Sequence, residues 1–197
     1  MTDDSGNYLS NEGNEVNYNL KGRLLLSAPF LDDIFKRSVI LVTENNQEGS
    51  VGFILNKETD FKLHEIIEDF PEFDSKVFIG GPVQQNSLNF IHRAGEILSD
   101  SFEISDGIYW GGNLDHLKLL IESNAVSPND FRFYLGYSGW GKGQLENELS
   151  IKSWYLGNPH PDNIFNDESS SLWSRILRKM GNEYSVISTF PEDPSVN

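Results

Sequence analysis

The sequence has no cysteine and few basic residues, and each shortage excludes classes of protein. Without cysteine among its 197 residues, the chain can form neither disulfides nor thiolate metal sites, and it has no cysteine nucleophile. Its 15 lysines and arginines face 30 aspartates and glutamates, which gives a net charge of −15. Such a chain repels nucleic acid and acidic membrane surfaces unless it carries a local basic patch. We therefore expect no direct binding to DNA and no association with a membrane.

The sequence also lacks long apolar runs and a secretory signal. No stretch approaches the roughly 18 apolar residues of a membrane-spanning helix. The first residues are acidic and polar, unlike the basic and apolar regions of a signal peptide. Together with the absence of cysteine, these features predict a cytoplasmic protein. No cofactor and no metal site is predicted.

The residues that are present have the composition of a single globular domain. Apolar residues make up 38% of the chain and aromatic residues 12%. We predict a flexible acidic arm over residues 1–19, a domain over 20–190 and a flexible tail over 191–197. The charge is not confined to the ends. One of the 15 bases and seven of the 30 acids lie outside residues 23–180, which leaves that region at −9.

Strands and helices are expected in irregular order along the domain. Residues 39–43 form a continuous β-branched run, typical of a strand buried on both faces, and turn residues at 44–49 make it a hairpin with the next strand. The lack of strict strand–helix alternation argues against a Rossmann sheet. The expected strands are 23–27, 39–43, 51–56, 77–79, 88–92, 131–137 and 153–156, and the expected helices are 62–70, 113–123, 144–150 and 170–180.

The usual catalytic motifs are incomplete. A phosphate-binding loop needs Ser or Thr after its Gly-Lys pair, and here Lys142 is followed by Gly143. A nucleophile elbow needs glycine two residues after its serine, and Trp140 stands there after Ser138. A glycine turn between a strand and a helix is the favoured interpretation of this stretch. His92 is a candidate ligand or base, although a structural histidine is the favoured interpretation.

The spacing of the carboxylates in the predicted helix 144–150 argues against a catalytic acid–base pair. Glu146 and Glu148 lie two residues apart, so they do not share one face of a helix. We interpret them as part of a solvated face with one contact near the start of the helix.

Three segments taken together are specific enough to indicate a family. They are residues 29–39 (PFLDDIFKRSV), 80–83 (GGPV) and 135–148 (LGYSGWGKGQLENE). In this order they resemble the AlgH/YqgE family of bacterial proteins, and the resemblance runs from about Leu24 to Met180. It implies a single α+β domain with a mixed, bifurcated, barrel-like sheet flanked by helices. The family is described as uncharacterised and carries a transcriptional-regulator label, so the resemblance implies little about function.

One position of the family pattern is ambiguous here. The chain is one residue short between the aspartate and the phenylalanine of the first segment. Counting from Phe35 selects Asp32 as the equivalent aspartate, whereas counting from Pro29 selects Asp33.

The motif residues have two physical interpretations of equal weight. Arg37 and Ser38 offer a cation and a hydroxyl, and the glycines allow a close approach of the backbone, so the segments could build a pocket for an anion or a nucleotide-like ligand. Alternatively, the glycines pack under Trp140 and Arg37 pairs with Asp32 or Asp33. The ligand-binding candidates are Arg37, Ser38, Gly80, Gly81, Pro82, His92, Tyr137, Ser138, Gly139, Trp140, Gln144 and Glu146.

Three functions remain open, in descending order of support. The first is a binding or regulatory module whose glycine-rich face engages an unknown small anionic ligand or a protein partner. The second is a hydrolase of a small anionic substrate that uses Ser138 or His92, with Arg37 holding the anion, but no complete nucleophile–base–orienter set is apparent. The third is a DNA-binding regulator, as the family label suggests, although the chain lacks a basic recognition helix.

Overall fold

Strands dominate the part of the chain that the computed structural model describes, which comprises residues 19–31, 33–165 and 168–191. The strands are β1 (Leu24–Ser27), β2 (Val39–Asn46), β3 (Gly49–Ile54), β4 (Lys76–Ile79), β5 (Val83–His92), β6 (Phe102–Ser105), β7 (Ile108–Trp110), β8 (Phe131–Gly141) and β9 (Trp154–Gly157). The α-helices are α1 (Leu63–Ile66), α2 (Leu114–Glu122), α3 (Gln144–Ser150), α4 (Pro161–Phe165), α5 (Leu172–Met180) and α6 (Asn182–Ile187). Short 3₁₀ helices cover Asp33–Phe35, Pro128–Asp130 and Ser169–Ser171.

The strands form one open, mixed sheet. From edge to edge its order is β6-β7-β5-β8-β3-β2-β1-β9, and β4 pairs with β8 off this path. The β4–β8 pair is parallel, whereas the neighbours along the path pair in antiparallel fashion. Because β6 and β9 are separate ends, the sheet is not closed into a barrel. The predicted single α+β domain with a bifurcated sheet is confirmed.

The sheet divides along β8, which is why it is bifurcated. The first half of β8 pairs with β4 and β5, and the last residues, 138–141, pair with β3. Gly80 lies at the division. Its N–H donates to the carbonyl of Leu135, and its carbonyl accepts from the N–H of Ile54 and the hydroxyl of Ser138. A single glycine thus connects three strands at the branch.

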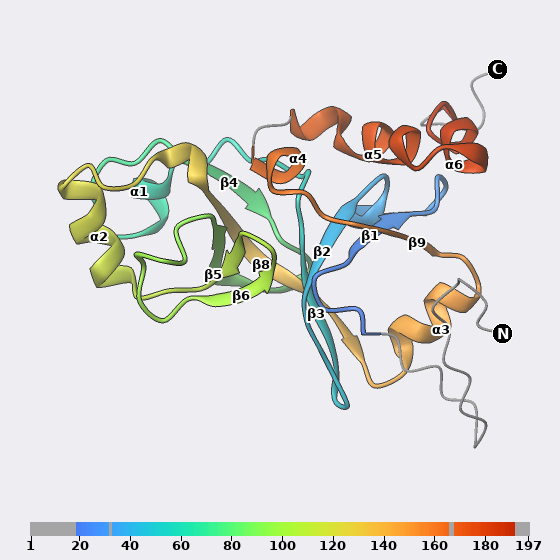
Figure 1. The fold of residues 1–197 in the computed structure, drawn as a ribbon, viewed down its shortest axis with the longest axis horizontal. Coiled ribbons are helices and arrows are strands. Elements are labelled where there is room, and N and C mark those ends of the chain that lie inside the picture. Colours follow the sequence, from blue (N-terminus) through green and yellow to red (C-terminus); the bar gives the residue numbers. More distant parts are fainter. Residues whose placement is uncertain (1–18, 32, 166–167, 192–197) are drawn as a thin grey trace, which may run out of the picture.

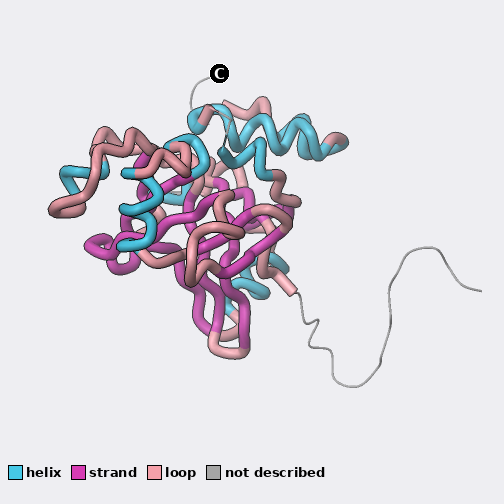
Figure 2. Tube along the Cα trace, turned by 60° about the vertical axis from the view of Figure 1, so that its left-hand side comes forward, coloured by secondary structure: helices cyan, strands magenta, loops and turns pink. Residues whose placement is uncertain are grey.

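Helices cover both faces of the strands near β1. On β1, Leu24 and Leu26 belong to the cluster that contains Trp173 of α5, whereas Leu25 packs in the cluster that contains Leu145 of α3. Val39–Thr43 of β2 is buried throughout, which confirms the predicted doubly buried strand. Figure 1 shows α4, α5 and α6 on one side of β1, β2 and β9 and α3 on the other, with α1 and α2 near the opposite end of the molecule. Figure 2 shows the strands at the centre and the helices around them.

Several predicted elements are confirmed closely. The prediction of a helix over 144–150 matches α3, and Asn113 caps α2 by accepting from the N–H of His116 at 2.9 Å. The predicted hairpin is formed by β2 and β3, whose pairing continues to Asn46 and Gly49.

Two predicted elements are wrong in extent. The helix expected over 62–70 is only one turn, α1, because the backbone is already extended at Ile67, with φ of −112° and ψ of 118°. Its apolar residues are nevertheless partly or fully buried. The glycine turn expected between the strand 131–137 and the helix 144–150 is also shorter than predicted, because β8 continues to Gly141 and pairs there with Gly49 of β3.

The predicted arm over 1–19 and tail over 191–197 lie outside the described residues except for residues 19 and 191. Within the described ranges, no helix has the length and apolar character needed to cross a membrane.

Candidate functional site

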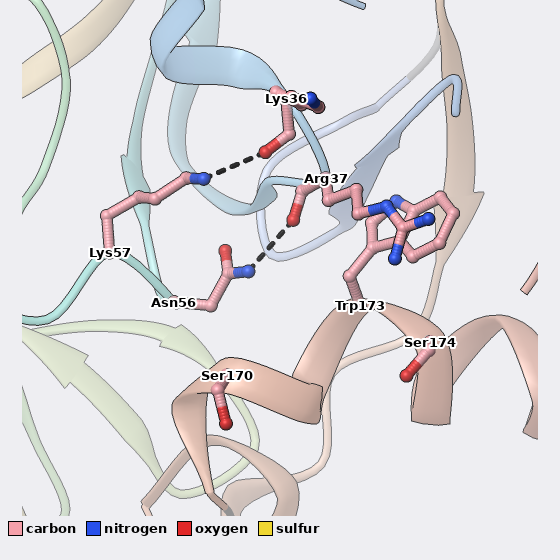
Figure 3. A pocket seen from close by; sticks show the side chains of 7 residues that line it. All are labelled: Lys36, Arg37, Asn56, Lys57, Ser170, Trp173 and Ser174. Atoms are coloured by element: carbon pink, nitrogen blue, oxygen red, sulfur yellow. Dashed lines mark hydrogen bonds between the residues drawn. The ribbon is translucent and has the colours of Figure 1, made fainter. Parts of the chain in front are cut away.

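A small pocket on one side of the sheet gathers three basic residues. Lys36 and Arg37 precede β2, and Lys57 follows β3, so the start of the β2–β3 pair brings them together. The 3₁₀ helix Ser169–Ser171 and α5 close the pocket from the other side. The cavity has a volume of about 200 Å³ (Figure 3). We call it the basic pocket; its described lining residues are Lys36, Arg37, Asn56, Lys57, Ser170, Trp173 and Ser174.

The backbone of the basic pocket is fixed by two side chains that follow β3. Asn56 donates its amide N–H to the carbonyl of Arg37 at 2.9 Å and accepts from the N–H of Val39 at 2.9 Å. Lys57 donates from Nζ to the carbonyl of Lys36 at 2.8 Å. These bonds hold Arg37 in a left-handed conformation with φ of 50°. A non-glycine residue in this region is uncommon and needs such support from its surroundings.

Arg37 lies flat over an aromatic ring. Its guanidinium carbon is 5.0 Å from the centroid of the Trp173 ring, and its Nη2 donates to the carbonyl of Phe190 (Figure 3). Trp173 is itself fixed, because its indole N–H donates to the carbonyl of Ser27 at 3.0 Å. Cation–π stacking therefore sets the direction in which the charge faces the pocket. Ser38 is buried beside Arg37 and does not line the pocket.

The glycine-rich candidates form the branch of the sheet, apart from the basic pocket. A Cβ on Gly80 would lie 2.3 Å from the carbonyl oxygen of Gly136, and one on Gly81 would lie 2.3 Å from the carbonyl of Tyr137. The close approach allowed by these glycines is therefore made by the protein's own backbone. Pro82 follows at the surface, and Ser138 is fully buried.

Trp140 and Gln144 contribute to a network around Glu148. One carboxylate oxygen of Glu148 accepts from the indole N–H groups of Trp140 at 2.9 Å and Trp154 at 2.7 Å. The other oxygen accepts from the side-chain amide of Gln144 at 2.9 Å, and Gln144 in turn accepts from the N–H of Gly141. The two indole rings meet edge to face at 5.9 Å. The family-like segment thus joins α3 to the end of β8, and Glu146 lies outside this network on the half-exposed side of α3.

His92 is a fully buried structural residue. Its Nδ1 accepts from the N–H of Ala94 at 3.1 Å, so Nε2 carries the proton and donates to the carbonyl of Gly111 at 2.9 Å. The ring stacks on Phe131 with centroids 5.2 Å apart. Burial lowers the pKa of the His92 imidazole from 6.5 to about 4, and the bond to Gly111 opposes this shift. The favoured interpretation of His92 agrees with these contacts.

The buried imidazole makes stability depend on pH. Between pH 6.5 and about 4, the unfolded chain binds a proton at His92 that the folded chain does not. The contribution of the neutral His92 to the free energy of unfolding is therefore complete above pH 6.5 and is lost as the pH falls toward 4. Between about pH 7.5 and about pH 5 this loss is about 2 kcal/mol.

Urea unfolding of wild type and His92→Gln at the two pH values measures this contribution. The variant should lose about 2 kcal/mol less than wild type on acidification, since glutamine does not titrate. His64→Gln, at an exposed histidine, controls for the substitution itself. Equal pH dependence in wild type and His92→Gln would contradict the assignment.

Sequence reasoning found Arg37 but missed most of its companions in the basic pocket. Lys57 and Asn56 are 19 or more residues away in sequence, and Trp173 has the apolar spacing of an ordinary core residue. The contact between Gln144 and Glu148 could have been predicted from the sequence, because the two residues are four positions apart and are therefore neighbours on one helical face. Asp32, one of the two proposed partners of Arg37, lies outside the described residues, and Asp33 is exposed.

The sequence matches one family of known proteins over most of its length. A family model described as AlgH-like matches residues 24–185. A UPF0301 protein of Chlorobium limicola is 44% identical over 185 residues, which cover 93% of this chain and 99% of the relative. One of Cytophaga hutchinsonii is 44% identical over 179 residues, with 90% and 98% covered. These matches confirm the resemblance indicated by the three sequence segments.

Two solved structures share the architecture. The crystal structure of a Corynebacterium diphtheriae protein aligns with a TM-score of 0.73 at 22% identity and covers 88% of this chain and 94% of that one. The solution structure of the AlgH protein from Pseudomonas aeruginosa aligns with a TM-score of 0.69 at 24% identity, with 91% and 98% covered. At these identities the likeness concerns the fold.

Proposed function

This chain belongs to the AlgH-like family, and we propose that it is a binding protein that takes a small anionic ligand in the basic pocket. The observation that carries the proposal is the gathering of Lys36, Arg37 and Lys57 around one cavity in a protein with a net charge of −15. Among the described lining residues of that cavity there is no aspartate or glutamate. The local field therefore opposes the field of the whole protein and favours an anion.

The size of the pocket limits the ligand. Sites for drug-sized molecules usually enclose about 300–1,000 Å³, whereas this cavity has about 200 Å³. A phosphate, a carboxylate or a similar compact group suits it better than a whole nucleotide. The hydroxyl of Ser170 and the cationic groups supply donors of the type that such oxyanions accept. The hydroxyl of Ser174 donates instead to the carbonyl of Ser171 at 3.1 Å.

The pocket is also preorganised, which lowers the entropy cost of binding. Asn56 fixes the backbone at Arg37, Trp173 fixes the guanidinium, and the bond from Lys57 to the carbonyl of Lys36 ties together the segments that flank β2 and β3. Arginine presents planar paired donors to oxyanions, and lysine presents a compact charge.

The other two functions gain no specific support from the geometry. A hydrolase based on Ser138 or His92 would need these groups to face a substrate. The hydroxyl of Ser138 donates to Gly80 and is fully buried, and both ring nitrogens of His92 are bonded to the backbone. A DNA-binding role would need a basic surface element, and α2 contains one lysine against two acids. α5 carries Arg175, Arg178 and Lys179, but the net charge of −15 opposes binding to a nucleic acid.

Titration calorimetry with inorganic phosphate at low ionic strength tests the proposal. Lys57→Met removes a charge but keeps most of the apolar stem, so we expect phosphate affinity to fall about tenfold or more, the equivalent of about 1.4 kcal/mol. Lys76→Met is the matched control, because Lys76 pairs with Glu58 at 3.0 Å away from the basic pocket.

Thermal melts of both variants verify that they are folded. Equal phosphate affinity in the two variants, or no measurable heat with wild type at millimolar phosphate, would overturn the proposal of an anion pocket.

A further inference from the structure

A second concave surface lies over the hairpin end of β2 and β3 and over β5 and β8, and it shares no lining residue with the basic pocket. It consists of two adjoining cavities of about 350 and 240 Å³ that share Glu44, Val51 and Tyr137. We call this surface the acidic groove. Its described lining residues are Glu44, Asn46, Glu48, Gly49, Ser50, Val51, Phe53, Val83, Gln84, Ser87, Leu88, Asn89, Trp110, Tyr137, Gly139 and Trp140.

The alternation of β8 explains the floor of the groove. Successive strand residues point to opposite faces, so Tyr137 and Gly139 share one face and Ser138 and Trp140 the other. The indole of Trp140 is bonded to Glu148 of α3, which places Tyr137 on the face away from α3. Gly139 carries no side chain there. The glycine therefore leaves a flat stretch of strand next to the Tyr137 ring.

One wall of the groove is the β2–β3 hairpin, and the other is the part of β5 where its pairing with β8 is irregular. On one side, the turn end of the β2–β3 hairpin, which pairs with β8 as far as Gly141, carries Glu44 and Glu48 (Figure 1). On the other side, the register of β5 against β8 shifts between Val83 and Leu88, so the residues between them leave the regular ladder. The groove lies between these two walls.

The lining has a consistent chemical character. Val51, Val83 and Leu88 are half-buried, as are the rings of Tyr137 and Trp110, so the floor is apolar and aromatic. The rim carries the two carboxylates, and among the described lining residues there is no lysine or arginine. An apolar floor with an acidic rim favours a partner that presents apolar and basic groups together.

We propose that the acidic groove binds an extended basic segment of a partner protein. Two adjoining cavities along one surface suit a chain better than a compact ligand. In an extended segment, alternate side chains point in opposite directions, so apolar side chains can lie on the floor while lysines or arginines reach Glu44 and Glu48. This site is separate from the basic pocket, and the two proposals stand or fall independently.

A glycine pair in β8 gives a matched test. A Cβ on Gly139 would lie 3.3 Å from Cε2 of Tyr137 and 3.9 Å from Cγ2 of Val83, so alanine fills the floor and touches only side chains. A Cβ on Gly141 would have its nearest neighbour, a side-chain oxygen of Gln144, at 3.9 Å and outside the groove. Gly139→Ala and Gly141→Ala therefore make the same chemical change inside and outside the groove.

The probe is a short synthetic peptide that alternates lysine and valine, and binding is followed by amide chemical shifts in NMR. With wild type we expect saturable shifts at Val51, Val83 and Tyr137. Gly139→Ala should weaken binding about tenfold or more, and Gly141→Ala should leave it unchanged. Glu48→Lys should also weaken binding, which supplies a second variant if Gly139→Ala melts at a lower temperature.

Three results with the peptides would overturn the proposal, and a fourth concerns a small amine. They are the absence of shifts at the groove, equal peptide affinity in the two glycine variants, and equal affinity for a peptide that alternates glutamate and valine. Binding of spermidine as tight as that of the lysine peptide would also overturn it, because the groove would then be a site for small amines.

Discussion

Replacement of Glu148 by alanine should lower the free energy of unfolding by about 2–5 kcal/mol. The carboxylate accepts from the indole N–H groups of Trp140 and Trp154, which are 6% and 3% exposed, and from the amide of Gln144. Alanine would leave the two buried indole N–H groups without an acceptor, whereas the exposed amide of Gln144 can bond to water. An unsatisfied buried donor costs about 1–3 kcal/mol, and bonds to a charged group are stronger than neutral ones.

Chemical denaturation of three variants measures this effect. Glu148→Gln keeps an oxygen for the indoles and should cost much less than Glu148→Ala. Glu146→Ala is the matched control in the same helix, and we expect it to change stability by about 0.5 kcal/mol or less. A similar stability of Glu146→Ala and Glu148→Ala would contradict the role assigned to the network.

Replacement of Gly80 by alanine should destabilise the protein by about 3 kcal/mol or more. The added Cβ would lie 2.3 Å from the carbonyl oxygen of Gly136 and 3.0 Å from Cβ of Tyr134. The first of these atoms belongs to the backbone of β8, so relief of the contact requires the branch of the sheet to shift. Gly80 also bonds to β3 and β8 through its own backbone, so such a shift weakens those bonds as well.

The control for Gly80→Ala is Gly141→Ala, whose Cβ meets no heavy atom closer than 3.9 Å. Melting curves and urea unfolding of the two variants should differ by several kcal/mol. A Gly80→Ala protein as stable as Gly141→Ala would show that this glycine is not required for the strand packing.

The sequence allowed prediction of the elements whose signals are local. The cap at Asn113 and the apolar spacing of α2 are readable from a few neighbouring residues, as is the turn that joins β2 to β3. The β6–β7 hairpin could have been predicted in the same way. Asp106-Gly107 lies between its two strands, and this dipeptide is among the strongest short-range signals for a hairpin.

The sequence did not allow prediction of how the glycine-rich segments are used. Because Gly80, Gly81 and Gly136 have no side chain, either a ligand or another strand can approach their backbone closely. The parallel pairing of β4 with β8 decides between these uses, because it brings the two segments against each other. Such pairing depends on residues more than 50 positions apart, for which the local sequence contains no signal.

The basic pocket was only partly predictable for the same reason. The pair Lys36-Arg37 is visible as a local cluster of charge, but the cluster by itself does not distinguish a pocket from a solvated turn. Lys57 joins it through the β2–β3 hairpin, and Trp173 through the packing of α5 on β1 and β2. The apolar face of α5 thus supplies the Trp173 ring under Arg37. From the helical spacing alone, Trp173 would be assigned to the core.

The most direct test of the anion proposal is an NMR titration of the ¹⁵N-labelled wild-type protein with inorganic phosphate. The amide and side-chain signals report which surface the ion contacts. If the basic pocket binds the ion, we expect saturable shifts at Arg37 and Lys57, at Ser170, and at the indole N–H of Trp173. Shifts confined to Gly80–Pro82 and Tyr137–Gln144, or no saturable shift at any site, would contradict it.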